Sequence, residues 1–312
     1  MTNTFQNMPW NDYSSYIKRT FGQRVQKISV NAGFTCPNRD GKISKGACIY
    51  CTNKSFSPFY CHSGASVREQ LEKGIAFFSP KYKTQKYLAY FQSFTNTYGD
   101  IDYLKKLYLE ALSVEGVEGL VIATRPDCID EDKLMMIKNI SKGKYISIEY
   151  GAESTIDKTL VFINRGHSYQ QTIDAVELTA KIGINTGLHM ILGLPGENEE
   201  DFYHHAKEIS KLPINTLKVH QMQVLKETKL AQIYNESPEL FFDLKLENYI
   251  LVIVKFLEFL NPNIIVERFT SESPKDMIIY PDWKGKKNFE ISHMVMAKMK
   301  ELDTYQGKRF VK

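Results

Sequence analysis

Three cysteines share one stretch between residues 29 and 58, and thiols grouped in this way can hold a metal ion or an iron–sulfur cluster. Cys36, Cys48 and Cys51 are spaced C-x11-C-x2-C, and glycines, prolines, Asn and Asp surround them. This composition favours a loop over a helix or strand. A closed structural metal site usually has four protein ligands. Three thiolates therefore indicate a centre with one position left open for chemistry.

The length and composition are those of a globular protein large enough for a sizeable core. The chain has 312 residues, 43% hydrophobic and 24% charged, and α/β barrels reach this size as single units. No apolar run approaches the ~18 residues of a membrane span, and the N-terminus lacks the apolar stretch of a secretory signal. Five cysteines, three of them in one loop, do not suggest a disulfide framework. We expect reduced thiols in the cytoplasm, where they serve a metal.

Short apolar segments alternate with helical patterns along most of the chain. Strands are predicted at 24–32, 86–92, 119–126, 144–154, 185–197 and 215–225. Helices are predicted at about 65–78, 101–114, 130–141, 155–163 and 169–182, and an acidic first turn marks another after residue 197. Asp100 can cap the helix at 101–114. Six strands separated by helices predict an α/β fold with a parallel sheet, open or barrel-like.

The pattern changes after residue 225. An apolar helix is predicted at 244–260, a further strand at 264–269 and an amphipathic helix at 288–302. No Pro/Gly/Ser-rich linker precedes this part. We therefore expect a core domain at 1–225 and an extension at 226–312 that packs on it.

The C-terminal segment carries the whole positive excess of the chain. The net charge is +4, and residues 281–312 hold eight Lys or Arg (284, 286, 287, 298, 300, 308, 309, 312) against four acids (282, 290, 301, 303). Such a segment is either an electrostatic footprint for nucleic acid or a solvated helix face and tail. Trp283 beside these lysines is either a stacking platform for a nucleotide or a packing residue.

Several stretches carry a resemblance to a known family. NAGFTCPNRDG, CIYC, YFQSFTNTY, ATRPD, HMILGLPGE, VHQMQVLKET and DTYQGK together reach from residue 31 to residue 308. They resemble the radical S-adenosylmethionine (SAM) superfamily, and within it the YtqA/YhcC-like branch related to the Elongator catalytic subunit and coproporphyrinogen dehydrogenase types. Most of that superfamily has C-x3-C-x2-C, whereas this branch has the longer first gap. The resemblance implies a partial (β/α)6 barrel with a C-terminal α+β extension.

The resemblance also implies the cofactors. A [4Fe–4S] cluster would be held by Cys36, Cys48 and Cys51, and the amino and carboxylate groups of SAM would chelate its fourth iron. One electron from the reduced cluster would cleave SAM to methionine and a 5′-deoxyadenosyl radical, which abstracts a substrate hydrogen. A reductase or flavodoxin-type electron donor is implied as well. The alternative from spacing alone is a zinc knuckle with Cys61 as its fourth ligand.

The resemblance also implies which residues contact SAM, most of them at the ends of strands. Tyr50 matches an aromatic position near adenine, or packs within the loop. Glu149 and Glu153 flank the glycine at the end of the fourth strand, where the family binds ribose, and Glu153 stands where Gln is common. A carboxylate accepts from both ribose hydroxyls. Arg165 matches an arginine that pairs with the SAM carboxylate, and the planar guanidinium of arginine suits a carboxylate. The alternative is that Arg165 is a surface residue.

Three more groups of residues are implied at the same mouth. Polar residues at the end of the second strand would bind the SAM amino group, or serve turn chemistry: Gln92, Ser93 and Thr95. Gly193 and Gly196 belong to a motif that supports adenine, or only form the turn. His220 would contact adenine or substrate, or is a core histidine. No role is assigned to Cys61 or Cys128 as thiols.

Three functions follow from these observations. The resemblance to the Elongator-type branch, together with the basic segment, implies radical processing of 5-carboxymethylaminomethyl uridine at the wobble position of tRNA. The second possibility is radical SAM chemistry on a small metabolite such as a porphyrin precursor. The third is a non-catalytic binding module that a metal stabilises. No membrane partner is expected.

Overall fold

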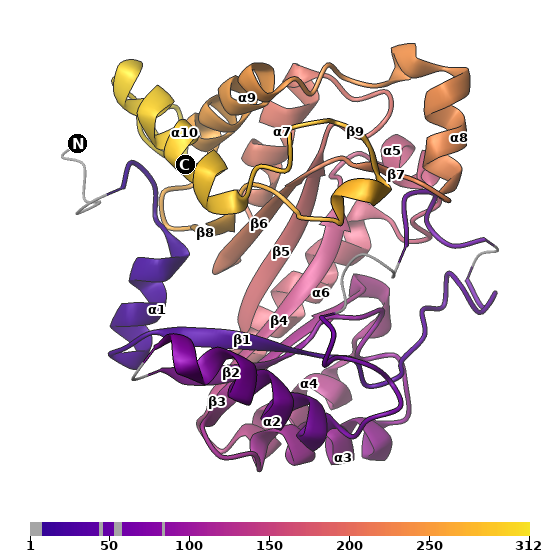
Figure 1. Ribbon diagram of the computed structural model, residues 1–312, viewed down its shortest axis with the longest axis vertical. Helices are drawn as coiled ribbons and strands as arrows, with labels where there is room; N and C mark the ends of the chain where they lie inside the picture. The colour runs from indigo at the N-terminus through magenta and orange to yellow at the C-terminus, as the bar shows by residue number, and fades with distance from the viewer. Residues whose placement is uncertain (1–7, 44–45, 53–57, 83–84) are drawn as a thin grey trace.

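One curled parallel sheet organises the molecule. The computed structural model describes residues 8–43, 46–52, 58–82 and 85–312. Within these ranges seven strands form a sheet in the order β1-β2-β3-β4-β5-β6-β8, and every neighbouring pair is parallel. The strands are β1 (Val25–Val30), β2 (Lys86–Phe91), β3 (Val117–Thr124), β4 (Tyr145–Glu153), β5 (Asn185–Leu192), β6 (Thr216–Gln221) and β8 (Ile265–Arg268). Figure 1 shows the sheet curled into part of a barrel.

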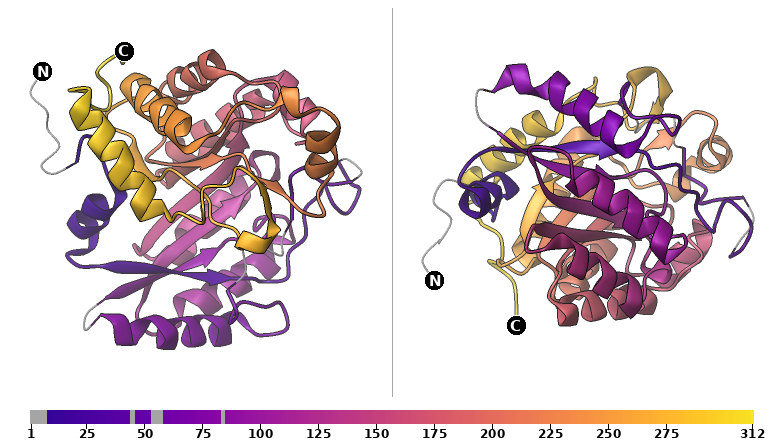
Figure 2. Two further views of the ribbon diagram at one scale, coloured as in Figure 1. Left: turned by 45° about the horizontal axis from the view of Figure 1, so that its top comes forward. Right: turned by 90° about the horizontal axis from the view of Figure 1, so that it is seen from below.

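The connecting helices lie on the outer, convex face of the sheet (Figures 1 and 2). They are α2 (Val67–Phe78), α3 (Ile101–Leu112), α4 (Glu131–Ser141), α5 (Asp157–Phe162), α6 (Tyr169–Ile182) and α7 (Glu199–Ile209). The side chain of Asp100 caps α3, as its sequence predicts, by accepting bonds from Asp102 and Tyr103 backbone N–H groups. The predicted α/β partial barrel is confirmed.

The strands are buried on both faces, as the apolar runs in the sequence indicate. In β2, Ala89 and Phe91 pack in the main core together with the helices. Leu88 and Tyr90 point to the other face and pack in a smaller cluster with Val121. Two buried faces explain why this strand has a continuous apolar run and no polar alternation.

The segment after β6 differs from the prediction. The expected strand at 215–225 is interrupted: β6 ends at Gln221, and β7 (Val224–Leu225) pairs with β9 (Ile278–Tyr280) in a separate antiparallel ribbon. The physical reason is Gln223, whose side-chain oxygen accepts bonds from Ser271 (3.3 Å) and Ser273 (2.8 Å), so the chain turns toward the C-terminal segment. The strand predicted in the extension, β8, joins the main sheet beside β6.

The remaining helices lie near the two ends of the chain. They are α1 (Tyr13–Phe21) and α8 (Lys229–Glu236), which the sequence patterns did not predict, and α9 (Leu246–Phe259) and α10 (Asn288–Glu301), which they did. Gln306 of the DTYQGK motif bonds to the N-terminal segment, since its backbone N–H donates to Pro9 O (2.9 Å) and its side chain accepts from Asn11 N (2.9 Å). The segment before α1 and the segment after α10 therefore lie side by side. None of the described helices has the length and apolar character needed to span a membrane.

Candidate functional site

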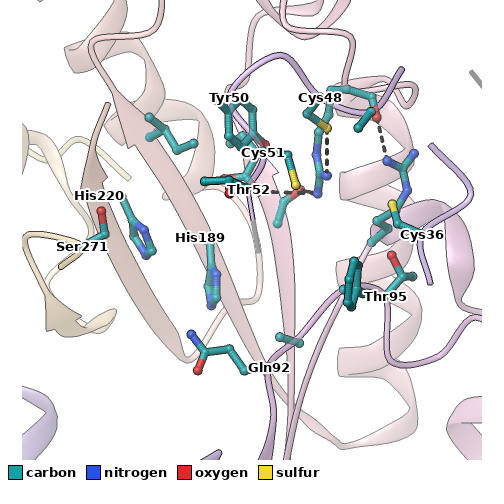
Figure 3. Close-up of a pocket in the computed structure, with 18 of the residues that line it drawn as sticks. Cys36, Cys48, Tyr50, Cys51, Thr52, Gln92, Thr95, His189, His220 and Ser271 are labelled. Atoms are coloured by element: carbon teal, nitrogen blue, oxygen red, sulfur yellow. Dashed lines mark hydrogen bonds and ion pairs between the residues drawn. The ribbon is translucent and has the colours of Figure 1, made fainter. Parts of the chain in front are cut away.

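A pocket of ≈ 250 Å³ lies at the carboxyl ends of the strands. It brings together most of the residues singled out in the sequence: Cys36, Cys48, Tyr50, Cys51, Gln92, Ser93, Thr95, Glu149, Glu153, Arg165 and His220. Figure 3 shows the three cysteines and Tyr50 on one side and His189, His220 and Ser271 on the other. The carboxyl ends of a parallel sheet are where α/β proteins bind ligands.

Gly193 and Gly196 are not among the lining residues, although Leu194 between them is. Both have positive φ, +91° and +84°, which a turn after β5 requires. A Cβ at Gly193 would lie 2.9 Å from Leu244, and the Gly196 N–H donates to Leu240 O at 2.8 Å. The two glycines thus shape the turn against the segment that follows α8.

The cysteine loop is held on the turn that follows α5. Ala47 N–H donates to Asn38 O (2.9 Å) and closes the long gap between the first two cysteines. The Asn38 amide donates to Asn164 O (2.5 Å), and the Asn164 amide donates to Ala47 O (2.6 Å). Gly166 permits this approach because a Cβ there would lie 2.4 Å from Asn38 Oδ1. Residues 44–45 and 53–57 of the cysteine segment lie outside the described residues.

The sulfur atoms face hydrogen-bond donors. Asn38 Nδ2 lies 3.4 Å from Cys48 Sγ, Arg165 Nη1 lies 3.8 Å from the same sulfur, and Arg39 Nη1 lies 3.9 Å from Cys51 Sγ. Cationic and amide donors of this kind stabilise thiolates, the form in which cysteine binds iron. This donor set fits an iron–sulfur cluster. Within the described residues, no three His, Cys, Asp or Glu side chains converge on a single metal ion.

The Nε–H of the Arg165 guanidinium has no partner among the residues that the structure describes. The Nη2 of Arg165 donates to Gly151 O (2.7 Å) and lies 3.5 Å from Glu153 Oε1, whereas its Nε is buried and makes no hydrogen bond. Buried donors in proteins are normally satisfied. The free Nε–H therefore fits a ligand acceptor, such as the carboxylate that the sequence resemblance implies.

A β-bulge turns Glu153 into the pocket. In the β4–β5 register Gly151 pairs with His189 and Glu153 with Met190, so β4 holds one extra residue, and Glu153 has a φ of +67°. Burial raises the pKa of Glu153, although Arg165 and Arg125 act in the opposite direction. Burial, and then Glu153, raises the pKa of Tyr50 well above its usual value.

Arg125, in the ATRPD motif, fixes the backbone of Arg165. It is buried and donates from Nε (2.8 Å) and Nη2 (2.7 Å) to the two carboxylate oxygens of Asp127. Its Nη1 donates to Arg165 O at 2.7 Å. The Arg and the Asp of the motif therefore act together to hold the backbone at Arg165.

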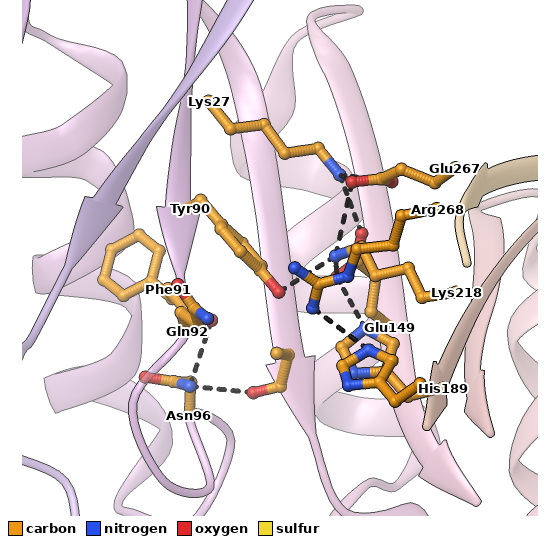
Figure 4. Close-up of polar contacts among 12 residues, drawn as sticks. Lys27, Tyr90, Phe91, Gln92, Asn96, Glu149, His189, Lys218, Glu267 and Arg268 are labelled. Carbon is orange, nitrogen blue, oxygen red and sulfur yellow. Dashed lines mark hydrogen bonds and ion pairs between the residues drawn. The ribbon is translucent and has the colours of Figure 1, made fainter. Parts of the chain in front are cut away.

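Glu149 is the centre of a buried ion-pair network (Figure 4). One carboxylate oxygen lies 3.0 Å from Lys27 Nζ, and the other accepts bonds from Lys218 Nζ and His189 Nε2 (3.0 Å). Burial opposes its charge, but Lys218 and Lys27 outweigh this and hold the pKa of Glu149 well below its usual range. Glu149 lines the pocket as the sequence suggested, with both oxygens already engaged by the protein.

Two neutral histidines stand beside this network. Burial, and then Lys218, lowers the pKa of His189 to about 4. Burial, and then Arg268, lowers the pKa of His220 well below its ordinary value. The two rings are stacked with centroids 5.5 Å apart, and Arg268 Nη2 lies 3.0 Å from His220 Nε2. A neutral His220 accepts this bond.

Sequence reasoning missed the residues of the network other than Glu149 and His220. Lys27, Lys218 and Glu267 are charged residues within the parallel strands β1, β6 and β8. A charge in a buried strand was the available signal, because such a charge needs a partner on the same face. Cys61 and Cys128 are free thiols and do not line the pocket.

Comparison with known proteins gives consistent matches. Residues 32–209 match the model described as "Radical SAM superfamily", and residues 214–301 match "Radical_SAM C-terminal domain". YtqA of Bacillus subtilis (strain 168) is 31% identical over 295 residues, which cover 95% of this chain and 91% of YtqA. YhcC of Escherichia coli (strain K12) is 29% identical over 274 residues, which cover 88% of this chain and 87% of YhcC.

Structural likeness extends to a larger protein. The archaeal Elp3 of Methanocaldococcus infernus has a TM-score of 0.70 at 19% identity, over 92% of this chain and 64% of the Elp3 chain. The likeness shows a shared fold. A tRNA uridine(34) acetyltransferase of Methanocaldococcus jannaschii is 26% identical over 121 residues, which cover 38% of this chain and 22% of that protein.

Replacing Gly166 tests the docking of the cysteine loop. In Gly166→Ala the new Cβ would collide with Asn38 Oδ1 and strain the cysteine loop by about 1–3 kcal/mol. We therefore expect the variant to lose at least half of its bound iron. Iron and sulfide are measured after anaerobic reconstitution. Gly143→Ala is the matched control, because Gly143 has a similar positive φ and no atom within 4 Å of its ideal Cβ. Equal iron content in the two variants would contradict the docking role.

Stability should depend on pH through His189. The pKa of His189 is about 4 in the folded protein, below its ordinary value. At a pH between these two values, the imidazole of residue 189 is protonated in the unfolded chain and neutral in the folded one. The stabilising contribution is present above pH ~6.5 and is lost as the pH falls toward 4. We expect His189→Gln to reduce the drop in unfolding free energy between pH 7 and pH 5 by about 2 kcal/mol. Denaturant unfolding followed by circular dichroism measures this, and an unchanged drop in the variant would argue against a buried neutral histidine.

Proposed function

The chain belongs to the radical SAM superfamily, and we propose that it acts on tRNA, at the side chain of a wobble uridine. The substrate we propose carries a 5-carboxymethylaminomethyl substituent, which is processed toward the 5-aminomethyl form. The observation that carries this proposal is the match over 121 residues to a protein whose name is tRNA uridine(34) acetyltransferase.

The chain is an enzyme that uses a [4Fe–4S] cluster and SAM. When bound, these supply a 5′-deoxyadenosyl radical, which removes one hydrogen atom from the substrate. The protein's own residues bind, orient and shield the reacting groups. We assign the cluster to Cys36, Cys48 and Cys51, which line one wall of the pocket beside the donors of Asn38 and Arg165.

We assign SAM to the same wall. The unpartnered Nε–H of Arg165 suits an oxygen of the SAM carboxylate, because a charge-assisted hydrogen bond of this kind is strong. Glu153 lies beside it with a carboxylate that can accept from ribose hydroxyls. The other SAM contacts we propose on this wall are Tyr50, Gln92, Ser93 and Thr95, which line the pocket. His220, for which the resemblance implies a contact with adenine or substrate, lines the opposite wall (Figure 3).

The opposite wall suits a substrate with an acidic substituent. It holds Arg268, two neutral histidines and the polar side chains of Gln223 and Ser271. We treat residues 1–225 as the catalytic core and 226–312 as an extension that adds Arg268 and Ser271 to the pocket. The proposed substituent contains both an amine and a carboxylate, and so needs a polar, partly cationic surface.

The basic C-terminal segment can contribute to tRNA binding although three of its lysines form ion pairs with carboxylates of the protein. Lys284, Lys286 and Lys287 lie 2.7, 3.1 and 2.9 Å from carboxylates of Asp282, Glu290 and Glu272. Exposed ion pairs contribute little to stability. A phosphate can therefore replace the carboxylate at small cost, and release of counterions favours this exchange.

The proposal also includes a reducing partner and compartment. A reductase or flavodoxin-type donor is needed to reduce the cluster. All five cysteines are free thiols, which is typical of a reducing compartment such as the cytoplasm.

The cluster assignment predicts the behaviour of single cysteine variants. Cys36→Ala, Cys48→Ala and Cys51→Ala should each reduce formation of 5′-deoxyadenosine to background, since each removes one of three thiolate ligands. The product is measured by liquid chromatography after anaerobic reconstitution and reduction with dithionite. Cys61→Ala is the control, because Cys61 is a buried cysteine outside the pocket, and it should keep its activity. Retained SAM cleavage in any of the first three variants would refute the assignment.

The substrate is tested with tRNA from a deletion strain. Mass spectrometry of its nucleosides should show accumulated 5-carboxymethylaminomethyl uridine and loss of the aminomethyl form and its derivatives. The wild-type gene should restore the profile, and the Cys48→Ala gene should not. An unchanged wobble-uridine profile would reject tRNA as the substrate and favour a small metabolite.

A further inference from the structure

The wall of the pocket opposite the cysteines contains a cation that forms no ion pair with a carboxylate in the described part of the chain. Figure 3 shows His189, His220 and Ser271 across the pocket from Cys36, Cys48 and Cys51. Arg268 lines the same pocket, and its Nη2 lies 3.0 Å from His220 Nε2. Arg268 therefore belongs to the wall that faces the cysteines.

A bulge in β8 places this arginine. In the β6–β8 register Leu217 pairs with Val266 and Lys218 with Arg268, so Glu267 is an extra residue. Strand side chains normally alternate between the two faces. The bulge lets Glu267 and Arg268 both face the interior, and bulges of this kind re-aim side chains next to active sites. Glu267 reaches Lys27, with oxygens 2.6 and 2.8 Å from its Nζ.

The charges on this wall leave an excess of one positive charge. Glu149 and Glu267 are both paired with Lys27 and Lys218, so two acids balance two lysines. Arg268 makes no ion pair with any described residue, and its contact with His220 is to a neutral ring. Its Nε is buried and without a hydrogen-bond partner.

An unpaired guanidinium at the wall of a pocket has a clear chemical preference. A partly desolvated cation attracts an anion more strongly than an exposed one does. The planar fork of arginine matches a carboxylate, which takes two parallel hydrogen bonds. His220 holds Nη2 by accepting its bond, which orients the guanidinium, and the Nε–H has no partner among the described residues.

We propose that Arg268, oriented by His220, binds the carboxylate of the substrate in the half of the pocket opposite the cysteines. This inference rests on the proposed function, in which the wobble substituent carries a carboxylate that the aminomethyl product lacks. Recognition by Arg268 makes the carboxylate the feature that separates substrate from product. His220 is then a positioning residue for Arg268.

SAM is a second source of a carboxylate, and the experiment separates the two. The anaerobic holoenzyme is titrated with a fluorescent anticodon stem-loop RNA carrying 5-carboxymethylaminomethyl uridine or 5-aminomethyl uridine at the wobble position. We expect wild-type protein to bind the carboxylated RNA at least about tenfold more tightly, the effect of one hydrogen bond to a charged group. In Arg268→Gln this preference should fall below about twofold, and in Arg268→Lys it should be intermediate, because charge remains without the fork.

Arg24→Gln is the matched control. Arg24 is exposed just before β1, at the other end of the strands, where it lies over the Tyr82 ring. Its replacement removes one positive charge from the molecule and should leave the preference for the carboxylated RNA unchanged. Iron content and circular dichroism check that the Arg268 variants fold and load.

Several outcomes would overturn the inference. Equal affinity of wild-type protein for the two RNAs would reject carboxylate recognition, while the nucleoside profile of the deletion strain still judges the tRNA proposal independently. A preference that survives in Arg268→Gln would reject Arg268 as its source. Weaker SAM binding in Arg268→Gln, with the RNA preference intact, would assign the arginine to SAM. If neither RNA binds, the two modified nucleosides are titrated instead. A preference for the carboxylated nucleoside that depends on Arg268 would support the carboxylate site and argue against RNA as the substrate. If neither nucleoside binds, the carboxylate site is rejected.

Discussion

The pairing of Glu149 with two lysines is the constraint on which the inner face of the sheet depends. An isolated carboxylate buried on β4 would be far too costly to keep charged, so its cations must be supplied at fixed positions. Lys27 comes from β1 and Lys218 from β6, and Glu267 on β8 contacts both. These ion pairs link strands that are distant in the sheet order, across the interior of the curl. Their contribution is to the relative placement of the strands more than to net stability, since well-packed apolar groups can replace buried ion pairs without loss.

The cysteine wall is held by a different kind of interaction. Its loop is fixed by backbone and amide hydrogen bonds between Asn38, Ala47 and Asn164, and the close approach at Gly166 completes the contact. Few ionisable side chains take part in this docking. One wall of the pocket is thus shaped by charge pairing across strands and the other by hydrogen bonds between loops. The pocket lies where the two systems meet, at the carboxyl ends of the sheet.

Much of this arrangement could be predicted from the sequence because it depends on local patterns. Buried apolar runs predicted the strands, and a capping Asp100 predicted the start of α3. The clustered cysteines predicted that Cys36, Cys48 and Cys51 lie at one site, and they line one pocket. Tertiary pairing could not be predicted in this way. The place of β8 beside β6, and the ion pairs of Lys27 with Glu149, join segments whose partners no local pattern specifies. The same holds for Gly193, whose neighbour Leu244 lies beyond the core strands.

The two bulges show how polar residues reach the rim of the pocket, and why Arg268 was hard to predict from the sequence. A period of two assigns each strand residue to one face, and a single inserted residue reverses that assignment for everything after it. On β4 the insertion brings Glu153 to the cysteine wall, and on β8 it brings Arg268 to the opposite wall. Each bulge adds a polar side chain to the pocket without changing the pairing of the sheet behind it. Because the two bulges lie on different strands, the cysteine wall and the wall opposite it can change independently.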